Sequence, residues 1–282
     1  MKLEALPEEC IVQILSFTSP KEACQLSTVS TIVRDAADSE VLWEKFLPSD
    51  YRDILSRLVF PLEFKSKKDL FLQLCQPLLI DGGKSDGTFY IDKYINKKCF
   101  MLSARDLNIT WSSNTLYWCW KPFQPSRFPE VVELIMVTWL DIHGKINTKM
   151  LSPHTKYGAY LVIKLADRAH GLHSFPSEVS IEAGDYKSRG STRLRHKGLN
   201  NIGCSICCGC ILHSSNQPIN PAFCRGKERI LNERKDGWLE LELGEFYHDG
   251  NEKEVKMCLK EIYGQHIKGG LIVEGIELRP VV

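Results

Sequence analysis

The chain has 282 residues, of which 43% are hydrophobic and 25% are charged, and its formal net charge is +1. This length suits two modest domains that each bury a core. The balanced charge gives no general indication of nucleic-acid binding, and no apolar run is long enough to span a bilayer. The first nine residues lack the basic and apolar pattern of a signal peptide, so we expect the protein in the cytoplasm, with access to the nucleus.

The first 48 residues predict four short helices. Apolar residues recur at helical spacing over 7–17, 32–37 and 42–47, and Ser19-Pro-Lys-Glu22 forms a capping box that starts another helix. Helices this short can bury only a thin core. Two interpretations follow from the residues alone: a small helical cap on a larger domain, or an apolar face that a partner helix completes.

Residues 49–98 connect this helical segment to the rest of the chain. Helical spacing covers 51–60 and 67–75, and Gln76-Pro77 ends the second helix. From about residue 98 the pattern changes to that of short strands, at 160–165, 238–243, 255–263 and 271–278. The segment 131–142 is a long apolar run, which predicts one strand covered on both faces. Because Leu239, Leu241 and Leu243 alternate with glutamates, that strand should have one face inward. We therefore predict an α+β multidomain chain whose larger part is an all-β sandwich.

Three of the six tryptophans lie within residues 108–120. The segment predicts two short strands joined by a polar loop, and such a hairpin would bring Trp111 close to Trp118. Large flat rings either fill a core or form a wall on which a flat ligand stacks, and the residue spacing leaves both interpretations open for this pair. Trp120 and Trp139 are expected in the core.

Three features of the sequence need a separate explanation. Glu261 shares the strand parity of the apolar residues Val255, Met257 and Leu259, so its carboxylate needs a partner, a bulge or a ligand. The stretch from Cys204 to Cys224 holds five cysteines and a histidine, which fits zinc binding, redox pairing or a loop with incidental thiols. The basic segment 187–197 could bind an anion or direct nuclear import, or it could be a solvated loop.

Several blocks of the sequence resemble one known domain family. The blocks MLSARDLNITW, YWCW, RFPEVVEL, VTWLDIHGKI, LSPHTKYGAYLVIKLAD, DGWLELELGEF and GLIVEGIELRP occur in the order of the plant phloem-lectin (Nictaba-like) domain. The N-terminal blocks LEALPEECIVQILSF and VLWEKFLP resemble an F-box. Together they resemble the plant F-box–phloem-lectin proteins, with an F-box at 1–48, a connector at 49–98 and a lectin-like domain at 99–282.

The resemblance implies a fold and partners for both parts. It implies a jelly-roll-like sandwich, and an F-box that docks the Skp-type adaptor of a cullin-RING (SCF-type) ubiquitin ligase. The implied adaptor-binding residues are Leu6, Pro7, Ile11, Ile14 and Leu15.

The resemblance also implies a carbohydrate site. Trp111 and Trp118 match the stacking tryptophans of the lectin family, and Glu254 and Glu261 match its two acids, which would accept hydrogen bonds from sugar hydroxyls. The implied ligand is a glycan that contains N-acetylglucosamine, carried by a glycoprotein target. Ile267 stands where the family often has tryptophan, and Ser-Ser follows Trp111 where the family often has a small or glycine residue.

The sequence is therefore interpreted as a non-catalytic substrate receptor with no cofactor and no metal ion, whose target is a glycoprotein or another protein. One alternative is a stress-related lectin or a protein-binding module that acts without ligase assembly. Another is a sugar hydrolase in which Glu254 and Glu261 form a carboxylate pair. No nucleic-acid partner and no membrane span are expected.

Overall fold

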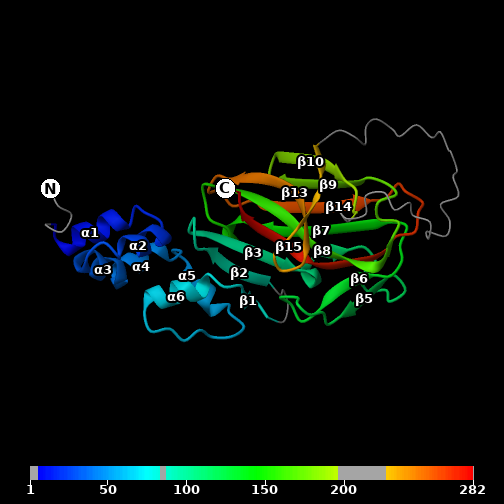
Figure 1. The fold of residues 1–282 in the computed structure, drawn as a ribbon. Helices are drawn as coiled ribbons and strands as arrows, with labels where there is room; N and C mark the ends of the chain where they lie inside the picture. Colours follow the sequence, from blue (N-terminus) through cyan, green and yellow to red (C-terminus); the bar gives the residue numbers. More distant parts are fainter. Residues whose placement is uncertain (1–5, 83–86, 196–226, 282) are drawn as a thin grey trace. The chain divides into compact units, whose positions relative to one another are not determined.

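The computed structural model describes residues 6–82, 87–195 and 227–281, which form two compact units, 1–100 and 101–282. Figure 1 shows the helices in blue to cyan and the strands of the second unit in green to red. The predicted architecture, short helices followed by a β-sandwich, is confirmed. Within the described residues, no helix has the length and apolar character needed to cross a membrane.

The first unit is built from six helices and a small hairpin. Its helices are α1 (Glu8–Leu15), α2 (Pro20–Leu26), α3 (Thr31–Asp38), α4 (Glu40–Phe46), α5 (Tyr51–Ser56) and α6 (Lys67–Leu74), and β1 (Leu78–Ile80) pairs antiparallel with β2 (Gly87–Asp92).

The capping signals position the helices as predicted. The Ser19 side chain accepts from the Glu22 amide, and the Glu22 carboxylate accepts from the Ser19 amide at 2.8 Å. The Ser39 side chain caps α4 by accepting a hydrogen bond from the amide of Leu42. Trp43 anchors the core of this unit, because its buried indole donates to the carbonyl of Ala37 at 2.8 Å.

The second unit contains two sheets. In one sheet the strand order is β3-β15-β8-β13-β12, and β6 pairs with β15 and β5 with β6. The bounds of its strands are β3 (Lys97–Ser103), β15 (Gly269–Pro280), β8 (Thr155–His170), β13 (Leu239–His248), β12 (Leu231–Glu233), β6 (Val131–Leu134) and β5 (Trp118–Lys121). The other has the order β11-β10-β9-β14-β7-β4; the bounds are β11 (Lys227–Arg229), β10 (Tyr186–Thr192), β9 (Ser177–Ala183), β14 (Glu254–Glu261), β7 (Leu140–Asn147) and β4 (Asn108–Ile109).

The two sheets lie face to face around an apolar core. A Cβ on Gly144 in β7 would lie 2.8 Å from the side chain of Ile276 in β15, and one on Gly244 in β13 would lie 2.4 Å from that of Ile181 in β9. Glycine therefore allows close approach of the sheets at both positions. The predicted inward register of Leu239, Leu241 and Leu243 is confirmed, because all three are buried.

Two predicted elements are wrong. The run 131–142 is not one strand, because β6 and β7 lie in different sheets and 135–139 crosses between them. Likewise 108–120 is not a hairpin, since β4 belongs to one sheet and β5 to the other. The apolar run of 131–142 and the alternation within 108–120 both predict strands, but such local patterns do not specify which sheet a strand joins.

A buried carboxylate on β15 is held by three arginines. Glu277 is almost fully buried and accepts hydrogen bonds from Arg127 at 2.8 Å, Arg234 at 2.6 Å and Arg279 at 2.9 Å. Arg279 also makes two hydrogen bonds to the carboxylate of Glu240. Burial alone would raise the pKa of Glu277, but the arginines outweigh it and lower that pKa to about 2.

This cluster predicts a dependence of stability on acid. The folded pKa of about 2 lies below the reference value of 4.5, so the stabilisation is complete above pH 4.5 and is lost as the pH falls toward 2. The shift corresponds to about 3 kcal/mol. Urea unfolding of Glu277→Gln should show a loss of about that size at pH 7, shrinking as the pH approaches 2.

Glu245→Gln is the matched control, because this glutamate pairs with Lys156 on the surface of the same unit. It should change the free energy of unfolding by less than about 0.5 kcal/mol. If the free energy of unfolding falls equally for wild type and Glu277→Gln between pH 4.5 and pH 2, the charged form of Glu277 is not the source of the acid dependence.

Candidate ligand-binding end of the β-sandwich

Three loops that cross between the sheets are joined at one end of the second unit. They are 110–117, 135–139 and 262–268, and we call their cluster the three-loop end. The amide of Ile135 donates to the carbonyl of Tyr117 at 2.8 Å, and Val137 and Lys268 exchange two backbone hydrogen bonds of 3.0 and 2.7 Å. The loops therefore support one another through their backbones.

Trp111 is exposed in the first of these loops. Its backbone has a φ of 62°, which is rare for a residue other than glycine, asparagine or aspartate and costs about 1–2 kcal/mol. Its side chain is 46% exposed, and its ring lies 5.4 Å from that of Tyr117 at an interplanar angle of 41°. The loop thus holds a large aromatic ring outward against a second ring.

Two indoles from β5 hold the backbone on either side of Trp111. Trp118 donates to the carbonyl of Thr110 at 3.0 Å, and Trp120 donates to that of Ser112 at 2.9 Å. The Arg105 guanidinium lies 3.7 Å from the centre of the Trp120 ring. These contacts restrain the loop in the conformation that exposes Trp111.

The predicted wall of two stacking tryptophans is wrong in this structure. Trp118 is 1% exposed, so its ring faces the core and offers no surface for a ligand. The hydrogen bond to Thr110 gives Trp118 a positioning role instead, since it orders the loop that presents Trp111.

Glu261 lies beneath the three-loop end. Its carboxylate is buried, forms an ion pair with Lys268 and accepts from the Gly264 amide at 2.7 Å. This explains the acid in the apolar register of β14, because a partner inside the protein satisfies it. Glu261 therefore does not face solvent in this structure, contrary to its predicted position in an open sugar site.

The partner of Glu261 connects two of the loops. Lys268 donates to the carbonyl of Thr138 at 2.7 Å and to that of His266 at 3.1 Å. Burial lowers the pKa of Lys268 to about 8, while the carboxylate beside it favours the charged form. The buried pair is part of the support under the loops.

Glu254 is far from this end. It begins β14, whereas Glu261 ends it, and seven residues of strand correspond to about 23 Å. Glu254 is exposed and lies 3.4 Å from Lys256 and 3.9 Å from Lys145. The predicted four-residue set is therefore not brought together, and the two acids are too far apart for a glycosidase pair, which needs a separation below about 10 Å.

The sequence prediction missed several exposed residues of the three-loop end. Trp139, expected in the core, is 44% exposed, and the three loops also carry the exposed residues Leu116, Met136, Tyr263 and Ile267. The apolar run of 131–142 gave no signal for this, because periodicity alone does not show that the run divides between β6 and β7. The three-loop end is consequently rich in aromatic and apolar surface.

The implied adaptor-binding residues also divide into two groups. Ile11 and Leu15 are buried within the first unit, so their predicted docking role is wrong in this structure. Ile14 and Pro7 are exposed and Leu6 is half-buried. The exposed apolar residues that the prediction missed on α1 to α3 and their connections are Phe17, Leu26, Val29 and Ile32.

Comparison with known families identifies two domains in the chain. Residues 3–49 match the F-box-like family model, and residues 97–280 match the phloem protein 2 model. The chain belongs to the F-box proteins with a phloem protein 2 domain. F-box protein PP2-B15 of Arabidopsis thaliana is 41% identical to this F-box–PP2 chain, over 98% of the chain and 96% of the relative, and F-box protein VBF of the same plant is 40% identical, over 98% of each.

Among solved structures, a family 35 carbohydrate-binding module from Clostridium thermocellum aligns with this F-box–PP2 chain at 9% identity and a TM-score of 0.33. The alignment covers 65% of the chain and 98% of the module. Likeness at this level carries no statement about ligands. The predicted family is confirmed by the two domain models and by the full-length relatives.

Proposed function

We propose that the chain is the substrate receptor of an SCF-type ubiquitin ligase and that it holds targets at the three-loop end through glycans containing N-acetylglucosamine. The F-box unit would bind a Skp-type adaptor and, through it, a cullin. The chain itself would bring no catalytic group. The observation that carries the glycan part is Trp111, a restrained and exposed ring beside Tyr117.

The chemistry of the three-loop end suits a sugar. The C–H face of a pyranose is apolar and stacks on an aromatic ring, and the methyl of an N-acetyl group is apolar too. Trp111, Tyr117 and Trp139 supply aromatic surface on two neighbouring loops. Because the backbone around Trp111 is already fixed by hydrogen bonds, little ordering entropy would be lost on binding.

Replacing Trp111 with alanine is expected to weaken binding of chitin oligomers by about 1–2 kcal/mol, because the stacking surface is removed. The melting temperature should stay close to that of wild type, since the ring lies at the surface. Glycan-array binding, isothermal titration and thermal melting on the full chain measure these effects.

Tyr186→Ala is the matched control, because Tyr186 is an exposed aromatic residue at the start of β10, outside the three loops. It should bind chitin oligomers like wild type. Equal binding by wild type and Trp111→Ala would remove the glycan site from the proposal. Absence of glycan binding in wild type would favour a receptor that recognises protein surface.

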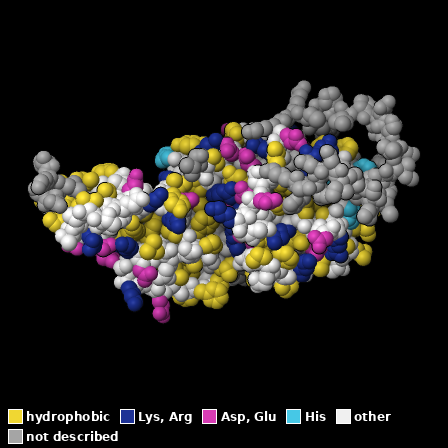
Figure 2. Space-filling view, in the orientation of Figure 1, with side chains coloured by type: hydrophobic (Ala, Val, Ile, Leu, Met, Phe, Trp, Pro, Cys, Tyr) yellow, Lys and Arg dark blue, Asp and Glu magenta, His cyan; other side chains and the backbone are white. Residues whose placement is uncertain are grey.

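The proposal places the protein in the cytoplasm and nucleus. Free thiols at exposed Cys10 and Cys119 are compatible with such reducing compartments. Lys and Arg lie among Asp and Glu on the face of the second unit in Figure 2, which agrees with the net charge of +1. In the basic segment, Lys187 and Arg189 pair with Glu182 and Glu178, while the cysteines from 204 to 224 lie outside the described residues.

A further inference from the structure

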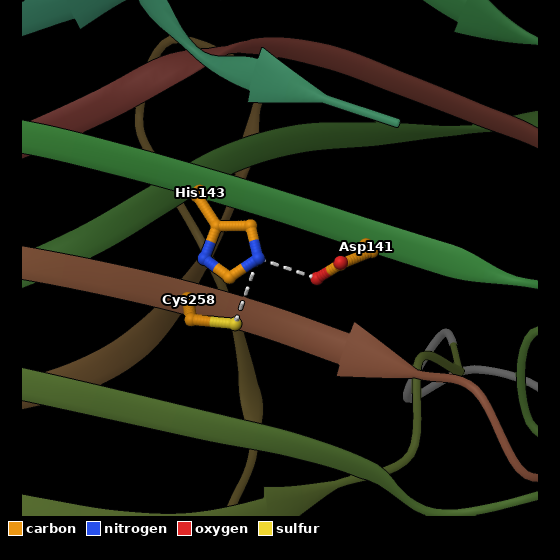
Figure 3. Close-up of side chains that lie close together, drawn as sticks. All are labelled: Asp141, His143 and Cys258. Atoms are coloured by element: carbon orange, nitrogen blue, oxygen red, sulfur yellow. Dashed lines mark hydrogen bonds and ion pairs between the residues drawn. The ribbon is translucent and has the colours of Figure 1, made fainter. Parts of the chain in front are cut away.

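Three side chains of different chemistry converge on the outer face of the second sheet (Figure 3). Asp141 and His143 are two residues apart on β7 and share one face, and Cys258 on β14 lies directly opposite His143. The His143 Nε2 lies 2.7 Å from an Asp141 carboxylate oxygen and 4.0 Å from the Cys258 Sγ. The three potential ligand atoms all lie within 4.8 Å of one another.

This arrangement differs from a catalytic triad. In a triad, the acid binds one nitrogen of the imidazole and the nucleophile binds the other, so that the histidine relays a proton between them. Here both Asp141 and Cys258 approach the same nitrogen, Nε2 of His143. Burial also raises the pKa of the Cys258 thiol to about 12, which disfavours a free nucleophilic thiolate.

Three ligand atoms that converge on one point suit a metal ion. Thiolate, imidazole and carboxylate are the ligands that Zn²⁺ takes, at about 2.0–2.3 Å from each donor atom. Tetrahedral coordination at those lengths separates donor atoms by about 3.3–3.6 Å. The distances of 2.7 and 4.0 Å lie on either side of that range, so small side-chain rotations would suffice.

The surroundings allow both charge and access. His143 is partly exposed, so a fourth position can face solvent. Lys260 lies opposite Asp141, and its positive charge disfavours a cation there. Glu178 lies opposite Lys260 on β9 and brings a negative charge to the same face. Ser180 lies opposite Cys258.

We propose that Asp141, His143 and Cys258 form a three-ligand Zn²⁺ site on the outer face of the second unit, with water in the fourth position. Binding releases the thiol proton of Cys258 and the Nε2 proton of His143 to solvent; where His143 is neutral its Nδ1 takes up a proton from solvent, so that Nε2 can give its lone pair to the ion in place of its contact with Asp141. The site lies beside the three-loop end, since the Thr110 amide donates to the Asp141 carbonyl at 3.0 Å. Its three ligand side chains are not among the residues proposed to hold a glycan, so the proposal does not depend on the glycan function. Its ligand class is a borderline-soft divalent cation.

The test uses the full chain with Cys204, Cys207, Cys208, Cys210 and Cys224 changed to serine, so that those thiols do not compete. Co²⁺ is titrated and followed by its thiolate-to-metal absorption, and Zn²⁺ affinity is measured by competition with a chromophoric chelator. We expect one equivalent to bind. Cys258→Ser should abolish the thiolate band and weaken Zn²⁺ binding by about 100-fold or more, since even residues beyond the ligands typically contribute 10–100-fold.

Cys119→Ser is the matched control, because Cys119 is an exposed free thiol on β5. It should leave affinity and absorption unchanged, and His143→Gln should weaken binding as Cys258→Ser does. Circular dichroism and melting without metal show whether each variant folds, and bound Zn²⁺ should protect Cys258 from alkylation in the unsubstituted site. Failure of the parent chain to bind metal, or equal binding by Cys258→Ser and Cys119→Ser, would overturn the proposal.

Discussion

Replacing Trp118 with leucine is expected to lower the free energy of unfolding of the second unit by about 3 kcal/mol or more. The indole is fully buried, so the smaller side chain leaves a cavity, and the carbonyl of Thr110 loses its hydrogen-bond donor. Urea unfolding followed by far-ultraviolet circular dichroism measures the effect without relying on tryptophan fluorescence.

Two further variants separate the causes of that loss. Trp111→Leu makes the same change at an exposed position in the preceding loop, 110–117, and should cost less than about 0.5 kcal/mol. Trp118→Phe keeps a buried ring but removes the indole N–H, so it should cost about 1 kcal/mol and weaken glycan binding through a looser loop around Trp111. Unchanged stability in Trp118→Leu would show that this ring is not a core residue.

The double variant Ile14→Asp, Phe17→Asp is expected to lose binding to the Skp-type adaptor. Both side chains are exposed on the first unit, Phe17 by 81%, and central apolar anchors typically contribute about 2 kcal/mol or more each to an interface. Charges at these positions add a desolvation cost on binding. Co-purification and titration with recombinant adaptor measure the loss. Leu6→Ala with Pro7→Ala, at the opening of the F-box, should also weaken the complex.

The control for the adaptor experiment is Phe60→Asp, which makes the same change at an exposed phenylalanine outside the F-box helices. It should bind the adaptor like wild type. Ile11→Ala should instead lower stability, because Ile11 is buried in the unit. Normal adaptor binding by the folded double aspartate variant would place the docking surface elsewhere.

Local signals in the sequence predicted local structure well. The Ser19–Glu22 capping box, the inward leucines of β13 and the misfit of Glu261 were all visible, because each depends on residues a few positions apart. Glu261 could be marked as needing a partner, but Lys268 could not be chosen from the sequence. That choice depends on how a crossing loop returns to the sheet.

The misplaced features depend on contacts between distant segments. Periodicity placed Ile11, Ile14 and Leu15 on one helix, but only the packing of the neighbouring helices left Ile14 outside. Alternation near Trp111 and Trp118 predicted strands, but it did not show that β4 and β5 join different sheets. The resemblance grouped Glu254 with Glu261, although the length of β14 separates them.

Affinity capture from plant extract tests most directly whether the chain joins an adaptor to a glycoprotein at the three-loop end. Full-length wild type, Trp111→Ala and Tyr186→Ala serve as baits, with and without chitin oligomers, and the captured adaptor, cullin and glycoproteins are quantified. We predict that Trp111→Ala or added chitin oligomers remove the glycoproteins while adaptor and cullin remain, and that Tyr186→Ala behaves like wild type. Glycoprotein capture that is unchanged by both the Trp111 substitution and the oligomers would contradict the proposed site.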